Sequence, residues 1–156
     1  MADEKPIEKR FSGANRRFAI VAARFNQSVV DTMIIGALDT LRNHETDVAS
    51  VSVLRVPGCF ELPLVAKKMA QKGEVDVVIA LGAVVRGETS HFDFVAGECA
   101  AGLQRAALET GVPMIFGVLT TDTKDQALER ADSAKGNKGG EAALAALEMA
   151  DLLHRL

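Results

Sequence analysis

Four short apolar runs, separated by segments with helical spacing, constrain the fold of this chain most strongly. The runs cover 18–23, 48–53, 75–81 and 114–119, and the helical segments cover 27–42, 60–72, 94–109, 123–132 and 141–155. Continuous apolar runs of this length are typical of strands buried on both faces. Strands that alternate with helices form right-handed crossovers and a parallel sheet. We therefore expect a three-layer α/β/α sandwich around a four-stranded parallel sheet, in a flavodoxin-like arrangement.

The first 15 residues are polar and differ in character from the rest of the chain. We interpret residues 1–15 as an arm, with Phe11 as a large apolar anchor, preceding a single domain over residues 16–156. A chain of 156 residues is long enough for one domain with a substantial core. Nothing in the sequence indicates a linker, an internal repeat or a second domain.

Charge and composition exclude several classes of partner. The net charge is −3 and no run of Lys or Arg occurs, so we expect no nucleic-acid partner. No apolar stretch approaches the roughly 20 residues that span a membrane, and the polar start lacks the apolar core of a signal peptide. We therefore expect a cytoplasmic location, where both cysteines stay reduced. No cluster of residues has the spacing of metal ligands, so no metal is expected.

The loops that follow the four strands carry the candidate chemistry. The carboxyl ends of parallel strands meet at one edge of the sheet, which is where open α/β sheets bind ligands. The loop after the third run covers 82–93, and its polar part from Arg86 onward holds a glycine, two hydroxyl side chains and His91 before a helical segment begins. Free N–H groups at a helix start bind anions, and a histidine exchanges protons near neutral pH. The sequence therefore indicates an anionic small molecule and acid–base chemistry.

Single residues in these loops have two interpretations each. Phe25 either stacks on a planar ring or packs against a core or a neighbouring chain. Glu61 either interacts with a helix dipole or accepts hydrogen bonds from substrate hydroxyls. A packed thiol is favoured over a nucleophile for Cys59, because no basic side chain adjoins it in the sequence. Arg130 and Lys138 flank a glycine-rich turn and either bind a phosphate or remain solvated.

Five motifs, in order along residues 16–155, resemble those of the lumazine synthase family. They are RFN at 24–26, VPGCFELP at 56–63, GAVVRGETSHFD at 82–93, FGVLT at 116–120 and GNKG at 136–139. The resemblance implies condensation of 5-amino-6-(D-ribitylamino)uracil with 3,4-dihydroxy-2-butanone 4-phosphate. The products would be 6,7-dimethyl-8-ribityllumazine, phosphate and water. It also implies that neither a metal nor an organic cofactor takes part.

The resemblance also implies a role for each matching residue. The ring of one substrate would be held by Phe25 and Asn26, its ribityl chain by Cys59, Phe60 and Glu61, and its uracil edge by the backbone of Ala83, Val84 and Val85. The other substrate's phosphate would bind at Glu88 and Thr89, and His91 would transfer protons. A neighbouring subunit would supply Phe116 and Arg130, and Lys138 would be a second cation near the site. Self-association follows, with active sites between subunits, as a pentamer or a sixty-subunit shell; we favour the pentamer. The arm would add a strand to a neighbour's sheet.

Two positions depart from the family pattern. Ala134 stands where many relatives carry a lysine, although Lys135 follows it. Glu88 stands where relatives often carry a small residue, so we expect its backbone to contact the phosphate and its side chain to face water. Two other functions remain open from the residues alone. They are a binding module for flavin or lumazine without catalysis, and a mainly structural shell protein.

Overall fold

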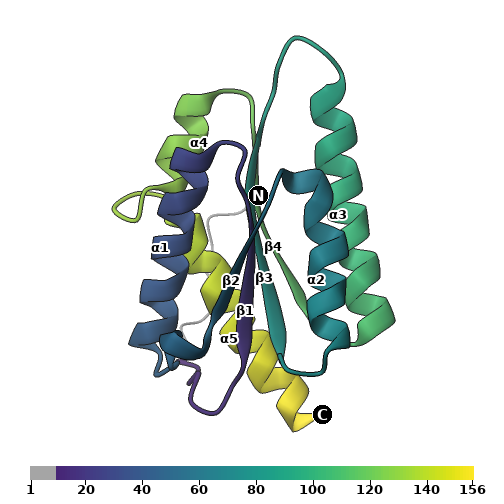
Figure 1. Ribbon diagram of the computed structural model, residues 1–156. Coiled ribbons are helices and arrows are strands. Elements are labelled where there is room, and N and C mark those ends of the chain that lie inside the picture. Colours follow the sequence, from purple (N-terminus) through teal and green to yellow (C-terminus); the bar gives the residue numbers. More distant parts are fainter. Residues whose placement is uncertain (1–9) are drawn as a thin grey trace.

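The computed structural model describes residues 10–156, which form one parallel sheet covered on both faces. The strands are β1 (Phe18–Ala23), β2 (Ser52–Val56), β3 (Val77–Val85) and β4 (Met114–Thr121), in the order β2-β1-β3-β4. The helices are α1 (Gln27–Asn43), α2 (Leu62–Gln71), α3 (His91–Thr110), α4 (Lys124–Ala131) and α5 (Lys138–Arg155), with short 3-10 turns η1 (Val48–Ser50) and η2 (Cys59–Glu61). Helices α1, α4 and α5 lie on one side of the sheet and α2 and α3 on the other (Figure 1). The three-layer prediction is confirmed.

The predicted bounds of three strands are wrong: those of β2 and β3, and the end of β4, which runs to Thr121 instead of Leu119. Residues 48–50 form η1 instead of strand, because the Asp47 side chain accepts a bond from Ala49 N at 3.2 Å and Ser50 Oγ donates to Asp47 O at 2.6 Å. Strand β3 runs on to Val85, where it still pairs with Thr121 of β4. Helix α3 begins at His91 instead of Phe94. The loop predicted at 82–93 is therefore shorter, covering 86–90.

Two apolar clusters, one on each face of the sheet, form the core. One packs Ile20, Ile79 and Leu81 against α1, α4 and α5, and the other packs Val21, Val78 and Ala80 against α2 and α3. Helix α5 lies close to α1 because Gly139 has no side chain: a Cβ there would overlap the backbone carbonyl of Met33. Fully burying a large aliphatic side chain contributes about 1.5–3 kcal/mol, so these clusters are the main source of stability.

The described part of the predicted arm packs on its own domain. Phe11 lies against the cluster beneath α1 and α5, and Gly13 N donates to His44 O at 2.6 Å. The predicted strand addition to a neighbour concerns the arm over residues 1–15, of which residues 1–9 lie outside the described residues. Within residues 10–156, no helix has both the length and the apolar character needed to cross a membrane.

Candidate active site

Two loops at the carboxyl edge of the sheet are joined by hydrogen bonds to each other and to the end of β3. Arg24 N donates to Val56 O at 2.7 Å and Phe25 N donates to Pro57 O at 3.0 Å, which joins the loops after β1 and β2. Asn26 has a left-handed backbone, with φ of 61°, and its Nδ2 donates to Ala83 O at 2.8 Å. Asparagine tolerates this conformation better than most residues. The loops after β1 and β2 are thus held against the end of β3.

Two aromatic side chains project from these loops into solvent. Phe25 is 74% exposed and Phe60 is 58% exposed. A Phe side chain usually buries most of its surface, so such exposure indicates a surface that binds another molecule. The alternative in which Phe25 packs into the core of its own domain is wrong. Stacking on a ring and packing on a neighbouring chain both remain consistent with its position.

Glu61 closes the turn after β2 with one of its two carboxylate oxygens. Gly58 N donates to Glu61 Oε2 at 3.0 Å. The side chain is exposed, and its other oxygen, Oε1, accepts no bond from the described residues. The turn therefore holds this carboxylate in one orientation while leaving an acceptor free for a hydroxyl group.

The Cys59 thiol is a packing group beneath β3. Its side chain is buried. Burial raises the pKa of the Cys59 thiol to about 11, with the Glu61 charge acting in the same direction and a hydrogen bond from Ala83 against it. A thiol with such a pKa carries little of the reactive thiolate at neutral pH. The predicted packed thiol is confirmed, and a nucleophilic role is disfavoured.

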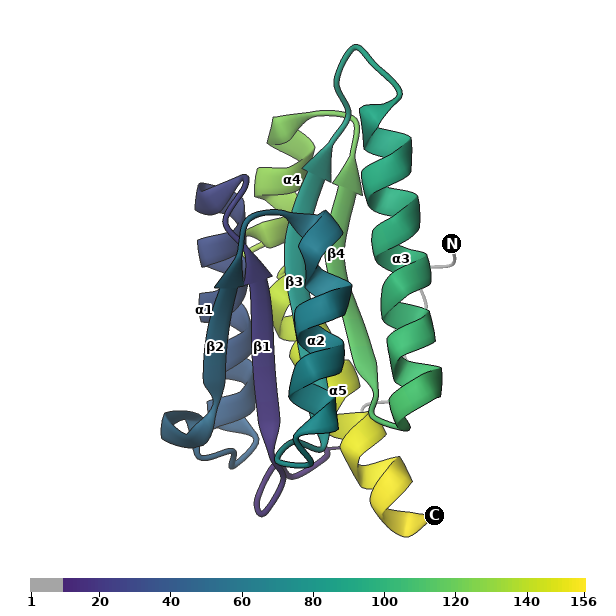
Figure 2. The same ribbon diagram turned by 45° about the vertical axis from the view of Figure 1, so that its right-hand side comes forward.

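The loop 86–90 and the start of α3 carry the polar residues of the candidate site. Ala83 and Val84 are buried at the end of β3, whereas Glu88, Thr89 and His91 are exposed. The backbone N–H groups of Glu88 and Thr89 donate to no described residue, and His91 N donates to Thr89 Oγ1 at 3.4 Å. This loop extends beyond the other loops at that edge (Figure 2). Free N–H groups and a hydroxyl at a helix start form an anion-binding arrangement.

Three predicted residues lie outside the loops that follow β1, β2 and β3. Phe116 is five residues before the end of β4, roughly 15 Å along the strand, and is 45% exposed. Arg130 is in the last turn of α4, where its Nη1 donates to Gln126 O at 3.3 Å. Lys138 begins α5 and its Nζ lies 2.9 Å from Glu141 Oε2. Ala134 and Lys135 are exposed between these helices. These three residues therefore lie on β4, α4 and α5, and not in the loops that carry Phe25, Glu61 and the 88–89 turn.

Arg86 makes contacts that the sequence analysis did not anticipate. Its Nε lies 3.1 Å from Asp122 Oδ1, its Nη1 lies 3.4 Å from Asp93 Oδ1, and its guanidinium carbon lies 4.2 Å from the centre of the Phe92 ring. Its own backbone N–H donates to Thr121 O at 2.8 Å. Arg86 thus connects the end of β4 with the first turn of α3.

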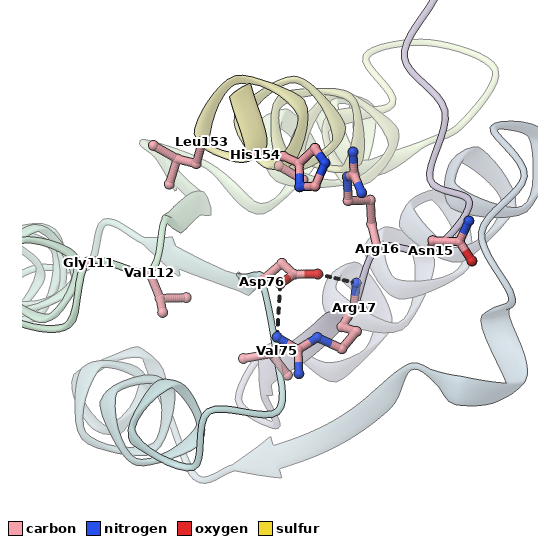
Figure 3. A pocket seen from close by; sticks show the side chains of 10 residues that line it. Asn15, Arg16, Arg17, Val75, Asp76, Gly111, Val112, Leu153 and His154 are labelled. Carbon is pink, nitrogen blue, oxygen red and sulfur yellow. Dashed lines mark hydrogen bonds and ion pairs between the residues drawn. The ribbon is translucent and has the colours of Figure 1, made fainter. Parts of the chain in front are cut away.

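A pocket of about 370 Å³ lies at the opposite end of the sheet from these loops. Figure 3 shows its lining, where Arg17 and Asp76 form an ion pair with 3.0 Å between Nη2 and Oδ1. Burial of the Asp76 carboxyl acts to raise its pKa, but the hydrogen bonds and charge of Arg17 outweigh this and lower it. None of the predicted site residues lines this pocket. In the described chain, no three His, Cys, Asp or Glu side chains form a group able to hold a metal ion.

Comparisons with known proteins agree with the motifs at the carboxyl edge. A family model described as 6,7-dimethyl-8-ribityllumazine synthase matches residues 15–154. Proteins named 6,7-dimethyl-8-ribityllumazine synthase from Nitratidesulfovibrio vulgaris, strains DP4 and Hildenborough, are each 53% identical over 152 residues, covering 97% of both chains. The chain therefore belongs to the 6,7-dimethyl-8-ribityllumazine synthase family.

Proposed function

We propose that this chain condenses 5-amino-6-(D-ribitylamino)uracil with 3,4-dihydroxy-2-butanone 4-phosphate, giving 6,7-dimethyl-8-ribityllumazine, phosphate and water. Its family makes it an enzyme of riboflavin biosynthesis, a transferase. The observation that carries the proposal is the presence of three exposed groups at the carboxyl edge of the sheet. They are the aromatic ring of Phe25, a Glu61 carboxylate oxygen that accepts no bond from the described residues, and the imidazole of His91 at the start of α3.

The pyrimidine substrate is proposed to bind across the loops after β1, β2 and β3. Phe25 would stack on its ring, and Phe60, the Cys59 backbone and Glu61 Oε1 would hold the ribityl chain. Strand β3 runs past the end of β1, since the last strand pair between them joins Ala22 with Leu81. Backbone groups of residues 83–85 on the β1 side therefore lack a strand partner and are suited to reading a uracil edge. Asn26 supports this edge through its bond to Ala83 O.

The phosphate of the second substrate is proposed to bind at the turn formed by Glu88 and Thr89. Two backbone N–H groups that donate to no described residue and the Thr89 hydroxyl supply donors there. The Glu88 side chain is exposed, which fits a backbone contact with phosphate and a carboxylate in water. A carboxylate turned toward the phosphate would repel it.

His91 is proposed to move protons during the condensation. Imine formation, loss of phosphate and ring closure each transfer protons between nitrogen, oxygen and carbon. The imidazole of His91 is exposed at the start of α3, beside the proposed phosphate turn. General acid–base catalysis contributes about 10²–10⁴-fold, and holding two reactants together contributes further. The proposed chemistry needs no metal or organic cofactor.

Self-association is proposed to complete the site, with a pentamer as the favoured assembly. The support is that Phe116, Arg130 and Lys138 lie on β4, α4 and α5, outside the loops that carry the other proposed site residues. In the proposed assembly they reach the site of a neighbouring subunit, where Arg130 would bind phosphate in fork geometry. The arm over residues 1–15 is proposed to join a neighbour's sheet. A cytoplasmic location is part of the same proposal.

Mixing purified protein with both substrates tests the proposed reaction. We expect lumazine absorbance and phosphate to appear together in equal amounts, faster than in the spontaneous reaction. We also expect His91→Ala to lower turnover while leaving residual activity from substrate binding. Absence of acceleration, together with tight binding of a flavin or ribityl-pterin, would support a binding module and refute the proposed reaction. Unchanged turnover in His91→Ala would refute the proton-transfer role alone.

A further inference from the structure

We propose that Arg86 is a positioning residue that fixes His91 and the 88–89 turn against the end of the sheet. The inference rests on the proposed function and assigns that site a residue that touches neither substrate. We use the name Arg86 clamp for Arg86 together with Thr121, Asp122, Phe92 and Asp93, the residues that it contacts.

The loop that carries the proposed phosphate turn has little other attachment. Residues 87–90 are exposed, and their hydrogen bonds within the described chain are local: His91 N donates to Thr89 Oγ1, and Asp93 N donates to Ser90 O at 3.0 Å. Bonds within one turn fix its internal shape but not its position relative to the sheet. The position must therefore be set by residues at its two ends.

Arg86 provides that attachment at both ends of the loop. Its backbone N–H, bonded to Thr121 O, prolongs the pairing of β3 with β4 by one residue. Its guanidinium contacts Asp93 Oδ1 and lies over the Phe92 ring, so it also reaches the first turn of α3. Phe92 and Asp93 directly follow His91 in the chain. Any shift of these two residues relative to the sheet moves His91 with them.

The other side of the clamp is itself fixed. Asp122, which contacts Arg86 Nε, has a backbone N–H that donates to Gln126 Oε1 at 2.9 Å. Gln126 N in turn donates to Thr123 Oγ1 at 3.1 Å, as part of a capping box at the start of α4. Arg86 therefore connects α3 with a helix start that has its own internal support.

The contacts of the Arg86 guanidinium differ from those of an ordinary charged side chain on the surface. The Arg86 side chain is about half exposed, and ion pairs at such positions contribute little to folding. However, a planar guanidinium can bond two carboxylates and stack on an aromatic ring at the same time, which an ammonium group cannot do. Losing Arg86 should thus change the position of His91 more than the stability of the fold.

Within the described chain, the Arg86 side chain makes no hydrogen bond to the pyrimidine side of the proposed site, although Phe92 packs on the apolar cluster that contains Val56 and Cys59. Phe25, Glu61 and Asn26 are held through Val56, Pro57, Gly58 and Ala83, and none of these bonds involves Arg86. Removal of Arg86 should therefore affect turnover and the phosphate substrate, while the KM for the pyrimidine stays nearly constant. A general structural defect would instead affect both substrates.

Steady-state kinetics on Arg86→Ala, Arg86→Lys and Asp122→Asn, with the full chain and both substrates, test this inference. Arg17→Ala is the matched control, because Arg17 also pairs with a carboxylate and a backbone carbonyl but lies at the opposite end of the sheet. We expect Arg86→Ala to lower kcat about ten- to a hundredfold, since misplacement by an ångström can cost this much. The pyrimidine KM should change by less than about twofold.

The conservative variants keep the inference testable if Arg86→Ala folds poorly. Arg86→Lys and Asp122→Asn should both have kcat values between those of wild type and Arg86→Ala, and Arg17→Ala should keep the wild-type kcat. Wild-type kcat in Arg86→Ala, or an equal loss in Arg17→Ala, would overturn the positioning role. A wild-type protein that does not accelerate product formation would instead overturn the proposed function, so the two failures are distinguishable.

Discussion

Replacing Gly82 by alanine tests how Cys59 supports the candidate site. Gly82 lies in β3 directly above the Cys59 thiol, and an added Cβ would overlap Cys59 Sγ. The same Cβ would lie 3.4 Å from Leu62 Cδ1 and 3.5 Å from Ala23 Cβ. Leu62 and Ala23 can accept the new methyl group, so the overlap with the thiol decides the result. To remove the overlap, Cys59 must move, and the turn that holds Glu61 must move with it.

The expected cost follows from the packing. Overfilling a packed core costs about 1–3 kcal/mol, and replacing glycine in a strand returns about 0.5–1 kcal/mol through the unfolded chain. Gly82→Ala should therefore lower the free energy of unfolding by about 1–2 kcal/mol. In a Cys59→Ala background the overlap is gone and the new methyl group occupies part of the vacated space. We expect an interaction energy of about 1–2 kcal/mol between the two substitutions.

Urea unfolding of the wild type, both single variants and the double variant measures this interaction energy. All four are compared at one protein concentration, since assembly contributes to apparent stability. Gly82→Ala should also raise the pyrimidine KM, and adding Cys59→Ala should restore it. Gly117→Ala is a matched control: its Cβ would lie 2.6 Å from Leu81 Cδ2 and 2.8 Å from Ala80 O, so Cys59→Ala should not rescue it.

Two results would refute this reasoning. If the effects of Gly82→Ala and Cys59→Ala on the free energy of unfolding add within about 0.5 kcal/mol, the thiol does not limit the space for a side chain at position 82. Loss of nearly all turnover in Cys59→Ala alone would mean that the thiol takes part in chemistry.

Three further predictions concern single groups. Arg130→Ala should raise the KM for the phosphate substrate much more than that for the pyrimidine, measured by varying each in turn; equal increases would contradict its phosphate role. Iodoacetamide at pH 8 should modify Cys59 about two-hundredfold more slowly than a free thiol, because a pKa of about 11 leaves little thiolate. Fast labelling of Cys59 in the folded protein would show that the thiol is not buried. The Asp76 carboxyl has a lowered pKa in the folded chain, so its contribution to stability is present above its unfolded pKa, about 4, and is lost as pH falls below it. Unfolding midpoints of wild type and Asp76→Asn between pH 6 and about 3 should therefore converge toward acid pH, and parallel curves would contradict this.

Local pattern was sufficient to predict the strands and helices but not all their ends. The run 18–23 matches β1 because all six side chains are buried. Residues 48–50 have a strand-like composition, yet bonds to Asp47 turn them into a 3-10 segment. The extension of β3 to Val85 depends on pairing with β4, a partner more than thirty residues later in the chain. Such distant pairing leaves no signal in a local window.

The motifs that directly follow strands were enough to predict one part of the candidate site. Contacts between residues far apart in the sequence could not be predicted. Phe25, Glu61 and His91 all lie near the predicted edge because parallel strands bring their carboxyl ends together. The contact of Arg86 with Asp122 joins positions 36 residues apart and depends on the order of β3 and β4 in the sheet. Sequence spacing alone gives no reason to pair them.

Activity of mixed assemblies tests most directly the claim that catalysis occurs at a site shared between subunits. His91→Ala and Arg130→Ala chains, each with low activity, would be combined in equal amounts under conditions that exchange subunits, with exchange verified by native mass spectrometry. In random hybrids, about a quarter of the sites would receive His91 from one subunit and Arg130 from the next, so about a quarter of wild-type activity should return. Activity no greater than the average of the two parent variants, in verified hybrids, would contradict a site shared between subunits.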